Sequence, residues 1–271
     1  LGMQGPCYNT DTACSTALVA SHAAAQMVRN AECEAALTLA VNLMLMPLGH
    51  MLIAGSGMTS ADGRCKFLDS RANGYVRSEG VGAVLLSPDA GAQAISMCST
   101  AVRSDGKSAS LTAPNGDAQM RLLRVALSVS GLETGDVQTA ECHGTGTALG
   151  DPIEMSSLCE VHVRSGDARH TIGGLKANVG HMEPSAGMVG LVSLQYMLRG
   201  STCSPNAHLR VLSAHVKRAI GGAACAMPTQ QSLVHEGSEL RGGGISSFGY
   251  AGTIARALIR REANSQPEAA H

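Results

Sequence analysis

The second half of the chain alternates extended segments with helical ones, and two of the junctions carry a histidine beside glycine. We predict strands over residues 137–142 and 171–176, each followed by a turn and then by a helix. Strands that alternate with helices predict an α/β fold with right-handed crossover connections. Ligands in such folds bind beyond the carboxyl ends of the strands, which is where the turn residues His143 and His181 are expected to lie.

Further helices and strands are predicted in the rest of the chain. We expect helices over residues 15–29, 47–54, 117–130 and 185–199, and strands over 35–45, 80–87, 94–103, 244–248 and 253–260. A further helix is predicted to begin with Asp151 as its cap, Pro152 in its first position and Glu154 three residues after the cap. Residues 200–241 are expected to be irregular, and 261–271 to form a tail or linker.

Composition excludes several classes of protein. A net charge of −1 and an aromatic content of 2% argue against a nucleic-acid partner. No apolar run approaches the roughly 20 residues of a membrane span. The nine cysteines are odd in number and form no Cys-x-x-Cys pair, so we expect free thiols, an intracellular location and no metal site. The chain begins at Leu1 without a targeting segment, and we expect it to be a fragment.

Cys14 lies where an extended stretch turns abruptly into a helix rich in small residues. A thiol at a helix N-terminus faces unpaired backbone N–H groups and the positive end of the helix dipole. Both favour the thiolate, which is the nucleophilic form. The other eight cysteines are interpreted as small buried hydrophobic residues. One activated cysteine with two histidines on turns predicts covalent acyl chemistry.

Both histidine turns carry further polar side chains. The first turn continues with Thr145 and Thr147, whose hydroxyls are expected to line a channel beside the imidazole. The second has Lys176 five residues before its histidine and Glu183 two residues after it, and these charges can set the tautomer and charge of the ring. The glycine-broken hairpin over 246–253 can contribute backbone N–H groups to an oxyanion hole near the cysteine.

Together these segments resemble the β-ketoacyl synthases, the condensing enzymes of fatty acid and polyketide assembly. The resemblance extends to about residue 260 and rests on residues 11–19, 141–147, 176–183 and 246–253, with secondary blocks at 62–69, 74–75 and 111–116. The His-Gly-Thr-Gly-Thr turn followed by Gly-Asp-Pro-Ile-Glu is similar to the multidomain type I polyketide synthases and animal-type fatty acid synthases.

The resemblance implies a thiolase-like fold, in which two similar α/β halves form a five-layered α/β/α/β/α sandwich, usually as a homodimer. Residues 1–110 would be the remainder of the first half with the nucleophile, 111–260 the second half with both histidines, and 261–271 a tail or linker. About a third of the family domain would precede the nucleophile. We therefore expect an incomplete first half, and a fragment that is poorly soluble or inactive by itself.

The resemblance also implies a mechanism. Cys14 would take an acyl chain from a thioester on an acyl carrier protein. A malonyl-type extender would then arrive on a phosphopantetheine arm that contacts Thr145 and Thr147. His143 and His181 would bind the extender's thioester carbonyl and stabilise the enolate formed as CO₂ leaves. No cofactor would be permanently bound, and neither nucleic acid nor a membrane would be a partner.

Further roles are implied for the residues around this centre. The backbone N–H groups of Cys14 and Tyr250 would form the oxyanion hole, and Tyr250 occupies the family's gating aromatic position. Lys176 would anchor the site of His181, with Glu183 as its partner. The expected partners are the acyl carrier protein, a second copy of the chain and adjacent domains of a multidomain synthase.

Departures from the family pattern keep alternatives open. Ile254 and Arg256 stand where the family usually has Asn and His, and Ser78 stands where a glycine is usual. The expected truncation and the altered run over 253–256 keep open, as the alternative, a non-catalytic relic or interaction module with the ketosynthase fold. Retention of Cys14, His143, Lys176 and His181 together argues against it. A thiolase would need a second cysteine near the C-terminus, and none follows Cys225. A cysteine hydrolase would leave the second histidine and the Lys176 block without an evident role.

Overall fold

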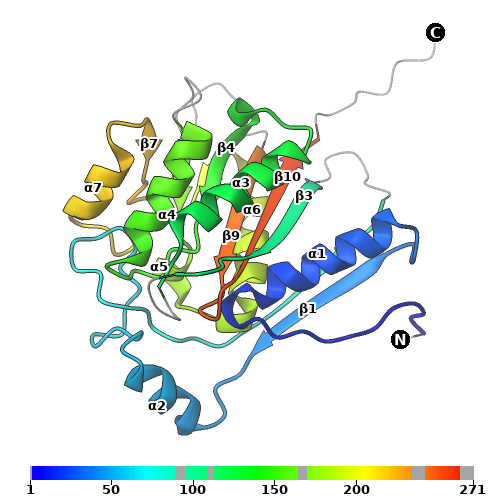
Figure 1. Cartoon of the computed structure of the whole chain (residues 1–271), viewed down its shortest axis with the longest axis horizontal. Helices are drawn as coiled ribbons and strands as arrows, with labels where there is room; N and C mark the ends of the chain where they lie inside the picture. The colour runs from blue at the N-terminus through cyan, green and yellow to red at the C-terminus, as the bar shows by residue number, and fades with distance from the viewer. Residues whose placement is uncertain (1, 89–94, 109–112, 164–169, 234–241, 263–271) are drawn as a thin grey trace.

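The computed structural model describes residues 2–88, 95–108, 113–163, 170–233 and 242–262 (Figure 1). Its largest sheet is six-stranded and mixed, in the order β3-β10-β9-β4-β5-β7. The strands are β3 (Ile95–Ser104), β10 (Thr253–Arg261), β9 (Gly242–Phe248), β4 (Val137–Glu141), β5 (His170–Gly173) and β7 (Cys225–Ala226). β10 pairs antiparallel with β3 and with β9, whereas β9, β4, β5 and β7 are parallel. The predicted α/β class is confirmed.

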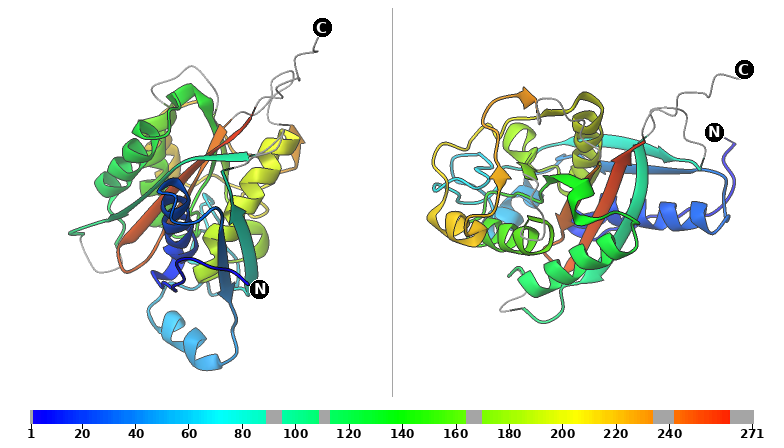
Figure 2. Two further views of the ribbon diagram at one scale, coloured as in Figure 1. Left: turned by 90° about the vertical axis from the view of Figure 1, so that its right-hand side faces the viewer. Right: turned by 90° about the horizontal axis from the view of Figure 1, so that it is seen from above.

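Helices cover both faces of this sheet (Figures 1 and 2). One face is covered by α3 (Gly116–Ser128) and α4 (Gly150–Leu158), and the other by α1 (Thr16–Arg29) and α6 (Ala186–Gly200). Ile254 and Leu258 of β10 pack in the cluster with α3. Ala255 and Ala257 pack in the cluster with α1 and α6. Since β10 is buried on both sides, its sequence reads as a nearly continuous apolar run.

A smaller sheet lies beside α1. It consists of β1 (Ala36–Asn42) and β2 (Gly80–Leu86), which pair antiparallel, and α2 (Pro47–Gly55) follows β1. One face of this sheet packs through Ala40 against Ala17 and Met188. The other face exposes apolar side chains, with Leu39 at 66% and Val81 at 71% exposure. Such an exposed apolar face favours association with other protein surface.

The region between α6 and β9 is more regular than predicted. It contains α7 (Ala214–Ile220), β6 (Thr202–Cys203) and β8 (Ser232–Leu233). The expectation that residues 200–241 are irregular is wrong for these parts. α7 has seven residues, of which Val216 and Ile220 are buried, so it is too short to give a periodic apolar pattern.

Several predicted boundaries also differ. α5 (Lys176–Val179) takes the place of the end of the strand predicted over 171–176, which stops at Gly173. α4 starts at Gly150, so Asp151 is not its cap. β10 continues to Arg261, and residues 263–271 of the predicted tail lie outside the described part of the chain. Within the described part, no helix combines the length and the apolar character that crossing a membrane requires.

The exposed face of the small sheet generates a prediction about solubility. Leu39→Lys combined with Val81→Glu should raise the soluble yield of the 271-residue chain, because both side chains are exposed and apolar. Ala40→Lys is the matched control on the buried face, and we expect it to cost about 3 kcal/mol and lower the yield. Soluble fraction after expression and centrifugation measures both. An unchanged yield for the double variant would contradict the prediction.

Candidate active site

The turn that carries Cys14 is held by the end of β9. Cys14 lies in a 3₁₀ turn, Ala13–Ser15, directly before α1, and the turn is strained because Ala13 has a φ of 55°. The Ser247 hydroxyl donates a hydrogen bond of 2.6 Å to the carbonyl oxygen of Cys14. Gly249 approaches so closely that a Cβ there would lie 2.4 Å from the Thr12 carbonyl oxygen. Only glycine fits at this contact, which fixes the cysteine relative to the sheet.

His181 is brought onto the cysteine from the far end of the chain. Its Nε2 lies 3.1 Å from the Cys14 sulfur, and its side chain is completely buried. Gly180, with a φ of 80°, makes the turn that exposes the ring to the cavity. The backbone N–H of Glu183 donates a hydrogen bond of 3.0 Å to Nδ1 of His181. Because a backbone N–H can only donate, the neutral ring carries its proton on Nε2.

His143 lies on the turn after β4 and is oriented in the same manner. The backbone N–H of Phe248 donates to its Nδ1 at 3.3 Å, so its proton is also on Nε2. The centroids of the two imidazole rings are 5.7 Å apart. Burial lowers the pKa of both histidines well below the usual range, and the charge of Lys176 lowers each pKa further. Two neutral rings therefore present Nε2–H donors.

Buried carboxylates shape the turn that carries His143. Glu154 accepts hydrogen bonds from the backbone N–H groups of His143 and Gly144, at 2.6 and 2.9 Å. Asp151 accepts from the N–H groups of Leu68, Gly146 and Thr147 at 2.8, 3.1 and 3.3 Å. Neither role was predicted from the sequence, where the two acids were interpreted as helix-capping residues. Most of their partners lie in the turn directly before α4, and only Leu68 is distant in sequence.

The pKa of Cys14 depends mainly on burial. Burial raises the pKa of Cys14 to about 12, although the charge of Lys176 and the backbone N–H groups of Cys14 and Tyr250 lower it. The backbone N–H groups do favour the thiolate, as expected, but desolvation of the buried anion outweighs them. The resting nucleophile is a thiol, with the Nε2–H of His181 directed at its sulfur.

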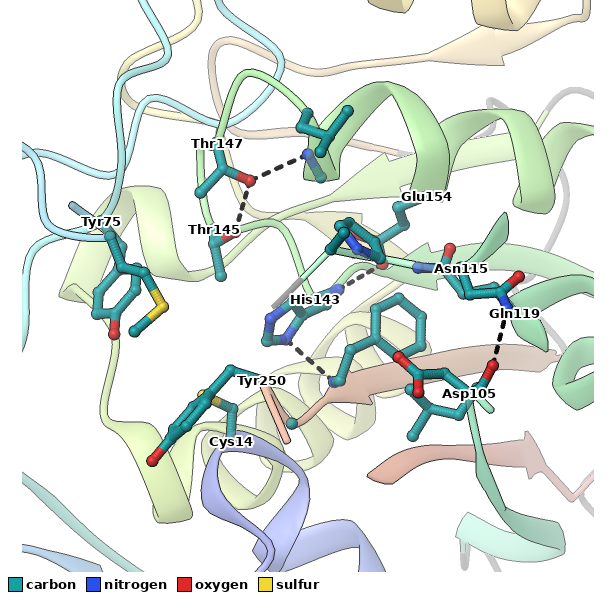
Figure 3. A pocket seen from close by; sticks show the side chains of 18 of the residues that line it. Cys14, Tyr75, Asp105, Asn115, Gln119, His143, Thr145, Thr147, Glu154 and Tyr250 are labelled. Atoms are coloured by element: carbon teal, nitrogen blue, oxygen red, sulfur yellow. Dashed lines mark hydrogen bonds between the residues drawn. The ribbon is translucent and has the colours of Figure 1, made fainter. Parts of the chain in front are cut away.

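One cavity of about 210 Å³ joins these groups (Figure 3). Its lining includes Cys14, His143, His181, Thr145, Thr147 and Tyr250, together with Met58, Tyr75, Ala113, Pro114, Leu149, Phe248 and Ile254. The hydroxyls of the two threonines are 3.3 Å apart, and the Thr147 hydroxyl accepts a hydrogen bond from the Gly150 N–H. The side chains that the sequence predicted to contact substrate therefore line one cavity.

Glu183 has a different partner from the expected one. Its carboxylate pairs with Arg77, whose Nε and Nη2 donate at 2.6 and 2.9 Å. The predicted pairing of Glu183 with Lys176 is therefore wrong. Lys176 is buried, outside the cavity lining, and acts on the site through its charge. Arg77 was not identified from the sequence, since nothing in its local pattern separates it from a surface arginine.

Arg256 places a different polar side chain where the family usually has a histidine. Its side chain is fully buried, and it donates a hydrogen bond of 2.9 Å to the Ser246 hydroxyl. Burial lowers the pKa of Arg256 to about 10, while the nearby Cys142 and Glu154 raise it. Ile254, by contrast, adds an apolar wall to the cavity. Ile254 thus puts a hydrocarbon side chain where the family usually has the amide of Asn. Arg256 puts a guanidinium cation where the family usually has an imidazole ring.

Comparison with models of protein families shows which family the chain belongs to. The model of the beta-ketoacyl synthase N-terminal domain matches residues 1–92, and that of the beta-ketoacyl synthase C-terminal domain matches residues 95–210. The chain belongs to the β-ketoacyl synthase family. Its relatives are ketosynthases of type I polyketide synthases, and its fold is thiolase-like.

Curated relatives are much longer than this member of the family. Erythronolide synthase EryA2 of Saccharopolyspora erythraea is 37% identical over 275 residues, covering 99% of this chain and 8% of that protein. A phenolphthiocerol/phthiocerol polyketide synthase of Mycobacterium tuberculosis is 38% identical over 273 residues, covering 96% of this chain and 12% of that protein. The matched region is thus a small part of large synthases.

Solved ketosynthases superpose closely on this chain. The oxazolomycin ketosynthase domain OzmH KS7 of Streptomyces albus JA3453 gives a TM-score of 0.90 at 32% identity, covering 98% of this chain and 48% of that one. The ketosynthase from module 6 of the bacillaene synthase of Bacillus subtilis 168 gives 0.89 at 32% identity with the same coverage. The chain spans about half the length of these ketosynthases.

The raised pKa of Cys14 predicts how the thiol reacts. Alkylation of Cys14 by iodoacetamide should rise about tenfold per pH unit through pH 9 without a plateau, because its pKa is about 12 and the thiolate remains a small fraction. A small free thiol in the same buffer is the reference, with a pKa of about 8.5. Peptide mass spectrometry of Cys14 measures the rate. A plateau near pH 7 would contradict the assignment of a resting thiol.

Proposed function

We propose that this chain provides the catalytic centre of a condensing enzyme. The reaction is a decarboxylative Claisen condensation between an acyl group on Cys14 and a malonyl-type thioester on an acyl carrier protein, in polyketide or fatty acid biosynthesis. The observation that carries the proposal is the shared cavity. One cysteine sulfur and two imidazole rings with Nε2–H donors line it together. Acyltransferase chemistry needs this combination of a nucleophile and preorganised donors.

The first step transfers the acyl group. The sulfur of Cys14 attacks the thioester carbonyl of the acyl carrier, and the carrier thiol leaves with the proton that the cysteine held. Negative charge on the carbonyl oxygen is stabilised by the backbone N–H groups of Cys14 and Tyr250, both of which lie near the sulfur. The products are an acyl-Cys14 thioester and a free carrier thiol, so the step leaves no net charge at the buried site.

The second step uses the two histidines. The thioester carbonyl of the extender accepts hydrogen bonds from Nε2–H of His143 and of His181. Loss of CO₂ converts the bound malonyl group into an enolate, whose oxygen gains the negative charge that these donors stabilise. The enolate carbon then attacks the acyl-Cys14 carbonyl, which releases the β-ketoacyl product and a cysteine thiolate that takes a proton from solvent. Neutral rings suit this role, because they donate without surrendering a proton.

Lys176 and Glu183 act on this centre from behind the cavity. The buried charge of Lys176 lowers the pKa of both histidines, which keeps the rings neutral, and lowers the pKa of Cys14. Glu183 holds the tautomer of His181 through its backbone N–H. Their role in the mechanism is thus to set charge and orientation.

The substrates and partners follow from this reaction. The phosphopantetheine arm of the carrier would pass Thr145 and Thr147, whose hydroxyls line the cavity, and no added cofactor is required. We propose that residues 1–110 carry the nucleophile, 111–260 both histidines, and 261–271 a tail or linker. We further propose an acyl carrier protein, neighbouring synthase domains and a second copy of the chain as partners, inside the cell.

The non-catalytic alternative has no observation in its favour. It rested on the expected truncation and on Ile254 and Arg256, and neither substitution separates the sulfur from the imidazole rings. A hydrolase would not need the second Nε2–H donor. The condensing reaction gives a role to the sulfur and to both imidazole rings.

Acyl labelling tests the nucleophile. An acyl thioester probe should add mass at Cys14 and at no other cysteine, because Cys14 alone meets both a substrate-sized cavity and the histidine donors. Cys14→Ala should abolish the label. Cys203→Ala, which changes a cysteine that is 1% exposed and outside the cavity, should leave the labelling intact. Equal labelling of several cysteines, or persistence in Cys14→Ala, would overturn the assignment.

Decarboxylation tests the two donors. His143→Ala and His181→Ala should each slow CO₂ release from malonyl thioester by about 10²- to 10³-fold, the usual effect of removing an oxyanion donor. His215→Ala is the control, since His215 is exposed on α7. Release of labelled CO₂ under single-turnover conditions measures the step itself. Wild-type rates in both variants would rule out the proposed role of the rings.

A further inference from the structure

Arg77 and Glu183 form a largely buried ion pair close to the reacting groups. Nε and Nη2 of Arg77 donate to separate carboxylate oxygens of Glu183 at 2.6 and 2.9 Å. The side chains are only 8% and 13% exposed. A two-pronged contact of this kind fixes the orientation of the carboxylate as well as its position, which a lysine would not do.

Both members of the pair are connected to His181 by backbone hydrogen bonds. The residues on either side of Arg77 bond the backbone of His181: its N–H donates to Val76 at 2.7 Å, and its carbonyl accepts from Ser78 at 2.9 Å. Glu183 donates its own N–H to Nδ1 of the ring at 3.0 Å. The pair therefore joins the segment that holds the backbone of His181 to the residue that sets its proton position.

The backbone of Glu183 is strained, so something must hold it. Its φ is 45°, in the left-handed region that non-glycine residues seldom adopt. This conformation directs the N–H group at the imidazole. The side-chain contact with Arg77 supplies a tertiary restraint on that strained residue.

We propose that Arg77 is a positioning residue, which keeps His181 in the Nε2–H tautomer by holding Glu183 in its strained conformation. The inference rests on the proposed function, because it assigns a use to the proton on Nε2. Without Arg77, the Glu183 carboxylate is buried without its partner and moves toward solvent. The Glu183 N–H then leaves Nδ1, the ring takes either tautomer, and a donor to the extender carbonyl is lost part of the time.

The charges of the pair support this arrangement. Glu183 raises the pKa of Cys14, while Arg77 lowers the pKa of His181. The two opposite charges lie side by side, so the pair itself carries no net charge. The pair can thus hold the backbone in place without adding a net charge beside the thiol or the imidazole.

The test combines Arg77→Met with His181→Gln. A glutamine amide can offer a donor near the Nε2 position but has no tautomers, so Arg77 has nothing to select in that background. Arg77→Met should lower kcat for malonyl decarboxylation about tenfold or more with KM changed less than twofold, but change kcat less than twofold when His181 is already glutamine. Arg260→Met is the matched control, since it breaks an exposed pair with Glu262 at 3.3 Å and should have no effect. The assays use the chain with its natural flanking sequence.

A second readout needs no turnover. ¹⁵N shifts of His181 should report one Nε2–H tautomer in the wild type and a mixture in Arg77→Met. Equal loss of activity in both backgrounds, or an unchanged tautomer, would overturn the inference. If the wild-type protein neither decarboxylates nor accepts an acyl label, the proposed function fails, and the ¹⁵N comparison still decides the role of Arg77.

Discussion

Two backbone N–H groups determine what this cavity can do. Those of Glu183 and Phe248 donate to the Nδ1 atoms of His181 and His143, which leaves each neutral ring with its proton on Nε2. Neither contact involves a side chain as the donor, so the tautomers are set by the course of the backbone. The rest of the structure holds the segments of Glu183 and Phe248 beside Cys14.

The end of β9 makes the largest contribution to this arrangement. Within four consecutive residues, Ser247 bonds the carbonyl of Cys14, Phe248 bonds the ring of His143, Gly249 allows the nucleophile turn to approach, and the Tyr250 N–H lies near the sulfur. β9 can do this because it lies between β10 and β4 in the main sheet. Burial on both faces makes that sheet a rigid base for the site.

Electrostatics within the site depend on burial more than on the helix end. A fully buried sulfur has its pKa raised to about 12, despite two nearby N–H groups and the charge of Lys176. The same burial lowers the pKa of both imidazoles. The resting site is therefore close to neutral, with donors oriented in advance toward charge that appears only during the reaction. This is the arrangement in which hydrogen bonds stabilise a transition state most effectively.

The sequence predicted the elements and the reacting residues better than their supports. Cys14, His143 and His181 were found because each lies on a turn beside glycine or other small residues, which is a local pattern. Arg77 was missed because its partner Glu183 lies in a distant segment. Glu154 and Asp151 were interpreted as helix-capping residues, whereas their carboxylates bond the turn before the helix. α7 was missed because it is too short to show a period. Contacts between distant segments and the net effect of burial on a pKa are properties of the folded chain.

A structure of the protein with the reaction stalled would test most directly whether both imidazole rings donate to the extender carbonyl. The protein would carry an acyl group on Cys14 and a malonyl amide analogue that cannot complete the reaction. We expect the analogue's carbonyl oxygen to lie about 2.7–3.2 Å from Nε2 of both His143 and His181. A carbonyl oxygen that contacts neither ring, or that reaches the cysteine from outside this cavity, would contradict it.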